Sequence, residues 1–231
     1  MRFTLTLLLL LTGLLDACAQ KYIPFPYTIE KEVLADSAAV VTAHPLATRA
    51  GLEVLRQGGN AVDAAVAVSF ALAVVYPQAG NIGGGGFMIY RDAAGNTAAL
   101  DFREKAPAAA TETMYQDSAG NVLPDKSRFG IFASGVPGAV DGMWEAHKKY
   151  GRLPWAGLLE PAILLADKGY QITEAEAEQL TGEKVNFIKN NQNVPVFVQM
   201  HPWQAGDWLI QKELAATLRR IAGYGRDGFY K

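Results

Sequence analysis

The sequence predicts a mixed α+β fold, in which helices and short strands build one domain. Three observations predict it. A short apolar run at residues 39–43 has the length and composition of a buried strand. Residues 61–75 are apolar on nearly every side, as a buried helix is. Two strand-like runs between residues 87 and 103 flank a turn-rich segment, as in a β-hairpin.

A helix is expected after the first strand. Pro45 suits its first turn, where the missing N–H of proline is not needed. Gly58 and Gly59 end it, because glycine reaches the left-handed conformation without a Cβ clash. Asn60 is placed as an N-cap with Asp63 in the first turn, so a second helix begins there and contains the apolar run.

The hairpin is expected to run from residues 87–90 to a returning strand at 98–103, with a turn between them. Arg103 then stands near the end of the second strand of a mostly buried hairpin. Residues 104–132 are rich in loop-forming residues, and one short helix is expected near Thr113.

Further helices are expected in the second half of the chain, and Gly169 ends one of them. No segment between residues 39 and 231 has the composition of a linker, so this region is expected to be a single domain. The expected helices span residues 140–150, 155–168, 174–180 and 212–221.

The first residues have the pattern of an export signal. Arg2 supplies a positive start, and the apolar run after it is shorter than the roughly 20 residues of a membrane-spanning helix. Two cleavage sites stay open: after Ala19, which frees the chain, or before Cys18, which would then carry a lipid. We expect a signal peptide at 1–19 and a linker at 20–38. The protein is then expected in the periplasm, the cell envelope or outside the cell, with membrane contact only through that lipid.

Composition and charge exclude several functions. A net charge of -2 and a pI of about 5.9 leave no basic surface for nucleic acid. The single cysteine allows no disulfide within the chain. The three histidines lack the spacing of zinc ligands, so no metal site is expected.

Gly83, Gly84, Gly85 and Gly86 form a run that must be distinguished from a phosphate-binding loop. It lacks the Gly-Lys-Ser/Thr end of a Walker loop and the third glycine of the dinucleotide fingerprint. A strand rather than a helix follows, so no helix N-terminus is directed at an anion. Two interpretations remain: a pocket wall, in which glycine allows close backbone approach or unusual dihedral angles, or a flexible loop.

Arg103 is the strongest candidate for substrate binding, because its planar guanidinium can bind a carboxylate through two parallel hydrogen bonds. Taken alone, such an arginine is more often the partner in a structural ion pair. Ser134 lacks the Gly-x-Ser-x-Gly elbow, and Ser69 lies inside the apolar helix, so no serine nucleophile is indicated. His44 and His147 are interpreted as capping and surface residues.

Several segments resemble, in order and spacing, the large subunit of the γ-glutamyltransferases (glutathione hydrolases), and together they cover nearly all of residues 39–231. In that family a motif similar to residues 101–107 contains the arginine that contacts the α-carboxylate of the γ-glutamyl group. The resemblance therefore implies that Arg103 binds substrate. The matching segments are AHPLAT at 43–48, GGNAVDAA at 58–65, NIGGGGF at 81–87, DFREKAP at 101–107, GVPG at 135–138, and residues 153–170 and 228–230.

The resemblance implies the αββα sandwich of the N-terminal-nucleophile hydrolases, with two stacked sheets between helical layers, incomplete in this chain. It implies that self-cleavage frees an N-terminal threonine, which attacks the γ-glutamyl amide of glutathione and related compounds without metal or organic cofactor. Water, an amino acid or a peptide then receives the glutamyl group. That threonine is expected beyond Lys231, so no catalytic residue is expected in this chain. Its expected partners are the C-terminal part of the large subunit and the small subunit.

Two alternatives stay open: a related acylase on the same scaffold, and a truncated, non-catalytic envelope protein that binds γ-glutamyl compounds. The arginine motif favours a glutamyl donor. We expect the isolated chain to be unstable or to aggregate, with strand edges and apolar faces of helices such as 61–75 exposed. Apolar burial is worth about 25 cal/mol per Å², and a folded domain is stable by only about 5–15 kcal/mol.

Overall fold

The computed structural model describes residues 34–231. The predicted signal peptide at 1–19, with its Cys18 lipidation site, lies outside the described residues, as does most of the predicted linker at 20–38. The described end of that linker, residues 34–38, is exposed and has no helix or strand. In the described part of the chain no helix has both the length and the apolar character needed to cross a membrane.

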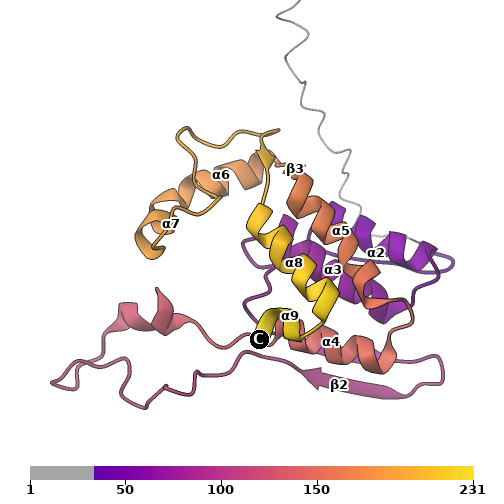
Figure 1. Ribbon diagram of the computed structural model, residues 1–231, viewed down its shortest axis with the longest axis horizontal. Coiled ribbons are helices and arrows are strands. Elements are labelled where there is room, and N and C mark those ends of the chain that lie inside the picture. The colour runs from indigo at the N-terminus through magenta and orange to yellow at the C-terminus, as the bar shows by residue number, and fades with distance from the viewer. Residues whose placement is uncertain (1–33) are drawn as a thin grey trace, which may run out of the picture.

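The core is a group of packed helices with α3 at its centre (Figure 1). Helix α3 contacts α2, α4 and α5, and α5 in turn contacts α8. The ring of Phe70 on α3 meets the ring of Trp155 on α5 edge to face, with centroids 5.6 Å apart. The prediction of a buried helix at 61–75 is therefore confirmed. These helices are α2 (Pro45–Arg56), α3 (Ala61–Val75), α4 (Ala139–Tyr150), α5 (Trp155–Lys168) and α8 (Lys212–Tyr224).

The ends of α2 and α3 follow the expected local rules. Gly58 lies just past α2 with a φ of 88°, the left-handed conformation that glycine favours. Asn60 and Asp63 form the expected capping box: the side chain of Asn60 accepts from the N–H of Asp63 at 3.0 Å, and Asp63 accepts from the N–H of Asn60 at 2.9 Å.

The hairpin consists of β1 (Phe87–Arg91) and β2 (Thr97–Asp101), which pair antiparallel. One face packs towards α4, where Tyr90 stacks on Tyr150 with ring centroids 4.2 Å apart. On the other face Phe87 is 65% exposed and Ile89 is 80% exposed. The hairpin is confirmed, but the expectation that it is mostly buried is wrong, because no described element covers this second face.

The strand expected at residues 39–43 is absent from the described chain. Val41, in the middle of this run, is 93% exposed. A strand needs a neighbouring strand for its N–H and C=O groups, and no described strand lies in register with this segment. The segment is apolar, but in the described part of the chain it has no partner strand that would make it a strand.

Residues 104–133 extend away from the helical core (Figure 1). The short helix expected near Thr113 does not form. The N–H of Gln116 bonds to the carbonyl of Thr113 at 2.9 Å as in a turn, and Gln116 then pairs with Val122 in an isolated bridge. Turn bonds that are not continued give no helix. Two short 3₁₀ turns follow, η1 (Pro124–Ser127) and η2 (Ile131–Ala133).

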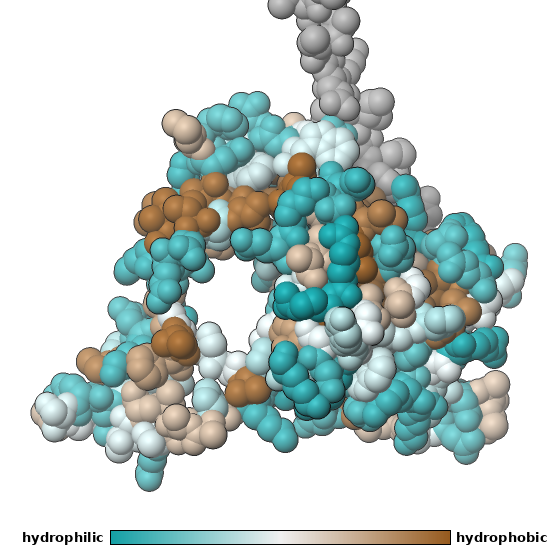
Figure 2. Space-filling view, in the orientation of Figure 1, coloured by the Kyte–Doolittle hydropathy of each residue, from teal (hydrophilic) through white to brown (hydrophobic). Residues whose placement is uncertain are grey.

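A second projection carries α6 (Glu174–Gly182) and α7 (Lys184–Asn190). It is attached to the core by a small sheet of β3 (Tyr170–Gln171) and β4 (Trp208–Leu209). Figure 2 shows an open gap between this projection and the segment that contains η1 and η2.

The four helices expected in the second half are confirmed as α4, α5, α6 and α8. Helix α5 ends at Gly169, whose φ is 83°. Helix α7, the β3–β4 pair and the short α9 (Asp227–Tyr230) were not expected.

Candidate functional site

Arg103 lies two residues past the end of β2, on a backbone that is held from both sides. Before it, Phe102 and Gly86 exchange backbone hydrogen bonds of 3.0 and 3.4 Å, which continues the hairpin pairing. After it, Lys105 and Val136 exchange bonds of 3.0 and 2.7 Å. The N–H of Arg103 itself donates to a carboxylate oxygen of Asp101 at 3.0 Å. The position of the Arg103 backbone is therefore set by fixed neighbours.

The glycine run packs closely against this segment. A Cβ on Gly85 would stand 2.6 Å from the Cα of Arg103 and equally close to the carbonyl oxygen of Phe102. A Cβ on Gly86 would lie 3.0 Å from the Phe102 ring. The carbonyl of Gly84 accepts from the N–H groups that begin α4, at 2.8 Å from Gly138 and 3.0 Å from Ala139. The glycines thus allow three backbone segments to meet.

Left-handed backbone is not the reason for these glycines. None of the four glycines from 83 to 86 has a positive φ. Of the two uses that the sequence suggested, tight approach and unusual dihedral angles, only the first is seen. Their role as a pocket wall stays a prediction.

The guanidinium of Arg103 is largely free in solvent. Its side chain is 61% exposed, and its Nη2 lies 3.7 Å from a carboxylate oxygen of Glu104. The same guanidinium lies 6.0 Å from the centroid of the Phe87 ring. An exposed pair of this kind contributes little free energy. A ligand carboxylate that binds with two parallel hydrogen bonds can therefore replace Glu104 at small cost.

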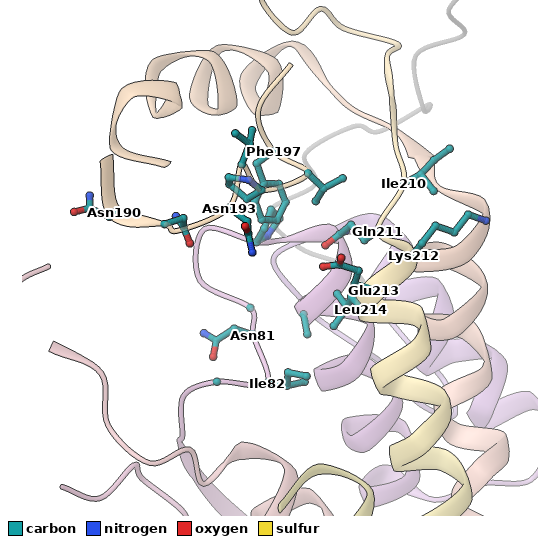
Figure 3. A pocket seen from close by; sticks show the side chains of 18 of the residues that line it. Asn81, Ile82, Asn190, Asn193, Phe197, Ile210, Gln211, Lys212, Glu213 and Leu214 are labelled. Atoms are coloured by element: carbon teal, nitrogen blue, oxygen red, sulfur yellow. The ribbon is translucent and has the colours of Figure 1, made fainter. Parts of the chain in front are cut away.

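A cavity of about 960 Å³ opens beside the first glycine of the run, and Arg103 does not line it (Figure 3). Asn81, Ile82 and Gly83 form one side of it. Residues 190–197, at the end of α7 and in the loop after it, and residues 210–214 at the start of α8 line other sides of it. At the start of α8 the buried Gln211 donates to the carbonyl of Val74 at 2.8 Å, so this polar group is already used in packing.

A second cavity, of about 740 Å³, contains a paired His44 and Glu176. Nδ1 of His44 accepts from the N–H of Leu46 at 3.2 Å and caps α2, as the sequence predicted. Nε2 of His44 lies 3.4 Å from Glu176, whose other oxygen accepts from the N–H of Thr173 at 2.7 Å. Burial alone would raise the pKa of Glu176, but the hydrogen bonds from His44 and Thr173 hold that pKa below its ordinary value. Burial also raises the pKa of Tyr170 on the same wall.

His147 is not the surface residue that we expected. Its side chain is only 15% exposed, and its Nε2 lies 2.8 Å from the carbonyl oxygen of Leu153 and 3.9 Å from the buried carboxylate of Asp63. Its ring also packs against Trp155, with centroids 5.3 Å apart. His147 lies on the inner face of α4, so the interpretation as a surface residue is wrong.

The two serines considered as nucleophiles have no catalytic surroundings. The hydroxyl of Ser134 lies 3.5 Å from the carbonyl of Gly130, and Ser69 lies within α3. Between residues 34 and 231 there is also no group of three or more His, Cys, Asp or Glu residues that could hold a metal ion.

Comparison with known sequences gives a consistent family. The sequence model of the gamma-glutamyltranspeptidase family matches residues 47–231. The chain is 51% identical over 199 residues to the glutathione hydrolase proenzyme of Pseudomonas sp. (strain A14), covering 85% of this chain and 35% of that protein. It is 44% identical over 214 residues to the glutathione hydrolase proenzyme of Escherichia coli (strain K12), covering 90% of this chain and 37% of that protein. The chain thus spans about a third of the length of these curated relatives.

Solved structures show the same likeness. The gamma-glutamyltranspeptidase of Helicobacter pylori superposes with a TM-score of 0.83 at 46% identity, over 87% of this chain and 58% of that one. A cephalosporin acylase from Bacillus halodurans superposes with a TM-score of 0.75 at 29% identity, over 89% of this chain and 39% of that one. The described residues are therefore a mixed α/β part of a larger fold that these proteins share. The chain belongs to the gamma-glutamyltranspeptidase family.

Proposed function

We propose that this chain is the N-terminal part of a γ-glutamyltransferase that hydrolyses glutathione and related compounds. In the proposed reaction a threonine hydroxyl, supplied by a part of the protein beyond this chain, attacks the γ-carbonyl carbon of the donor. The C–N bond breaks, the amine leaves with the proton, and a γ-glutamyl ester remains. Water or an acceptor amine then takes the glutamyl group. Family membership and the names of the relatives support this activity.

The role proposed for Arg103 is to bind the α-carboxylate of the γ-glutamyl group. The observation that carries it is a largely exposed guanidinium on a backbone fixed between the glycine run and residues 136–138. A fixed backbone with a free charged end can recognise a carboxylate at a defined place. The weak contact with Glu104 does not occupy both edges of the guanidinium.

The remaining partners are proposed from the same likeness. The complete protein would form the αββα sandwich of the N-terminal-nucleophile hydrolases, with the rest of the large subunit and the small subunit adding strands and helices. The uncovered face of the β1–β2 hairpin supports this, since an apolar strand face is normally packed against another layer.

We also propose export through the signal at residues 1–19. The N-terminal sequence of the mature protein, with lipid labelling of the wild type and of Cys18→Ser, tests whether the chain is freed after Ala19 or anchored at Cys18. A mature protein that retains residues 1–19 would contradict the proposed signal.

The test of the site uses the complete protein, including the part that carries the nucleophile, and a γ-glutamyl anilide. A charge-assisted hydrogen bond is worth about 1.5–3 kcal/mol, so Arg103→Ala should raise KM roughly tenfold to a hundredfold. Arg103→Lys should restore only part of the binding that is lost in Arg103→Ala, because an ammonium cannot form two parallel hydrogen bonds with a carboxylate. Arg91→Lys, at the exposed end of β1, is the matched control and should leave KM unchanged. An unchanged KM in Arg103→Ala removes the assigned role.

A related acylase is the second candidate, because the cephalosporin acylase of Bacillus halodurans superposes on most of this chain. The two functions are separated by the donor. Turnover of a cephalosporin side-chain amide but not of a γ-glutamyl anilide would favour the acylase. Binding of γ-glutamyl compounds with no turnover of either would favour the non-catalytic alternative.

A further inference from the structure

Phe102 connects the hairpin to Arg103 and sits against the beginning of α4. Its backbone pairs with Gly86 through bonds of 3.0 and 3.4 Å. Its half-buried ring packs against the hydrophobic core. Since Arg103 is the next residue, any movement of the Phe102 backbone moves the Arg103 Cα with it.

Two glycines of the α4 region leave the room that Phe102 occupies. Gly138 and Gly142 are four residues apart, so they lie on the same side of the helix. A Cβ on Gly138 would overlap the carbonyl oxygen of Phe102. A Cβ on Gly142 would overlap Cγ of the Phe102 ring and stand 2.5 Å from its Cβ. Any larger residue at either position would therefore displace Phe102.

The glycine run also packs closely against this segment. A Cβ on Gly85 would stand 2.6 Å from Arg103 Cα, and one on Gly86 would lie 3.0 Å from the Phe102 ring. Phe102 is thus confined between the glycine run and α4, whereas the side chain of Arg103 remains 61% exposed. The rigid part of this arrangement is the aromatic residue, and the arginine takes its position from it.

We propose that Phe102, seated on Gly138 and Gly142, is a positioning residue that fixes Arg103 for the donor carboxylate. This rests on the proposed function of Arg103. A residue that serves only the core would change stability when altered. A positioning residue also changes donor binding, and it does so only while Arg103 is present to be positioned.

The experiment measures KM and kcat with a γ-glutamyl anilide in the complete protein. Gly142→Ala should push Phe102 out of place and raise KM roughly tenfold or more, with kcat changed by less than about twofold. Gly157→Ala is the matched control: it also adds a methyl group inside a helix, and apart from its chain neighbours and its own helix backbone no atom lies within 4 Å of the added Cβ. The control should keep the KM of the wild type.

Phe102→Leu is the second variant, and it leaves the glycines unchanged. It tests the positioning role of Phe102 even if Gly142→Ala does not fold. It should raise KM in the wild type and have no further effect when combined with Arg103→Ala. Additive effects of Phe102→Leu and Arg103→Ala on KM would overturn the positioning role. So would a KM that stays unchanged in Phe102→Leu while Arg103→Ala raises it. If Arg103→Ala itself leaves KM unchanged, the proposed function fails first, and the two failures are distinguishable.

Discussion

The buried carboxylate of Asp63 provides the sharpest test of what holds the core together. Its side chain is fully buried at the start of α3. It accepts from the N–H of Asn60 at 2.9 Å, from that of Arg152 at 3.0 and 3.1 Å to its two oxygens, and from that of Leu153 at 3.3 Å. The Asp63 carboxylate thus accepts hydrogen bonds both at the start of α3 and from the loop between α4 and α5, and so holds that loop against α3.

Asp63→Ala would leave these three backbone donors without their acceptor. Each lost partner costs about 1–3 kcal/mol, and because none of the three donor residues is fully buried, the lower value applies. We therefore expect a loss of about 3 kcal/mol in the free energy of unfolding. Urea denaturation of the complete protein measures it, with Asp125→Ala on the exposed η1 turn as the control. A loss below about 1 kcal/mol would refute the reasoning.

Two further predictions concern packing and pH. Gly169→Ala should destabilise the protein by about 1–2 kcal/mol in urea denaturation, because φ is 83° and a Cβ would stand 2.6 Å from Ile210, whereas Gly157→Ala should have little effect. The pKa of Glu176 is depressed in the folded state by its hydrogen bonds, so the stability it contributes is present above about pH 4.5 and is lost as pH falls through the folded pKa. Glu176→Gln should therefore lose less stability than the wild type on acidification below that pH, and an identical acid profile would contradict the role of the pair with His44.

The helices could be predicted from the sequence because their signals are local. Asn60 and Asp63 mark the start of α3, and Gly58 and Gly169 mark the ends of α2 and α5 at positions that require a positive φ. Such rules act over a few residues and need no knowledge of the rest of the fold. The predicted boundaries of these helices therefore agree with the structure.

The strand expected at residues 39–43 shows where local reasoning ends. An apolar run indicates that a segment is suited to burial, but a β-strand forms only when a neighbouring strand pairs with its N–H and C=O groups. In the described chain that partner is absent, and Val41 is exposed. His147 is the opposite case: a surface position is expected for it, whereas the helical period turns its side chain towards Trp155.

The position of Arg103 at the end of the hairpin could be predicted from the sequence, but the way in which it is held could not. Gly142 stands inside a helix, where glycine is usually unfavourable, and nothing in its local sequence says that the ring of Phe102 needs the space. Contacts between residues about forty positions apart depend on the tertiary fold. Only an unexplained glycine in α4 could have pointed to them.

The uncovered face of the hairpin leads to a prediction about the chain alone. Phe87 and Ile89 stand side by side on this face at 65% and 80% exposure, on strands whose outer edges have no described neighbour. Burying such side chains is worth about 1.5–3 kcal/mol each, enough to drive self-association through the strand face. We expect chain 1–231 to elute as oligomers in size-exclusion chromatography, and Phe87→Thr with Ile89→Thr to shift it towards monomer. Val185→Thr, equally exposed on α7, should not. A wild-type monomer with a cooperative melting transition would show that the hairpin face is stable without a covering layer. The proposal that the rest of the fold packs on this face would then lose its support.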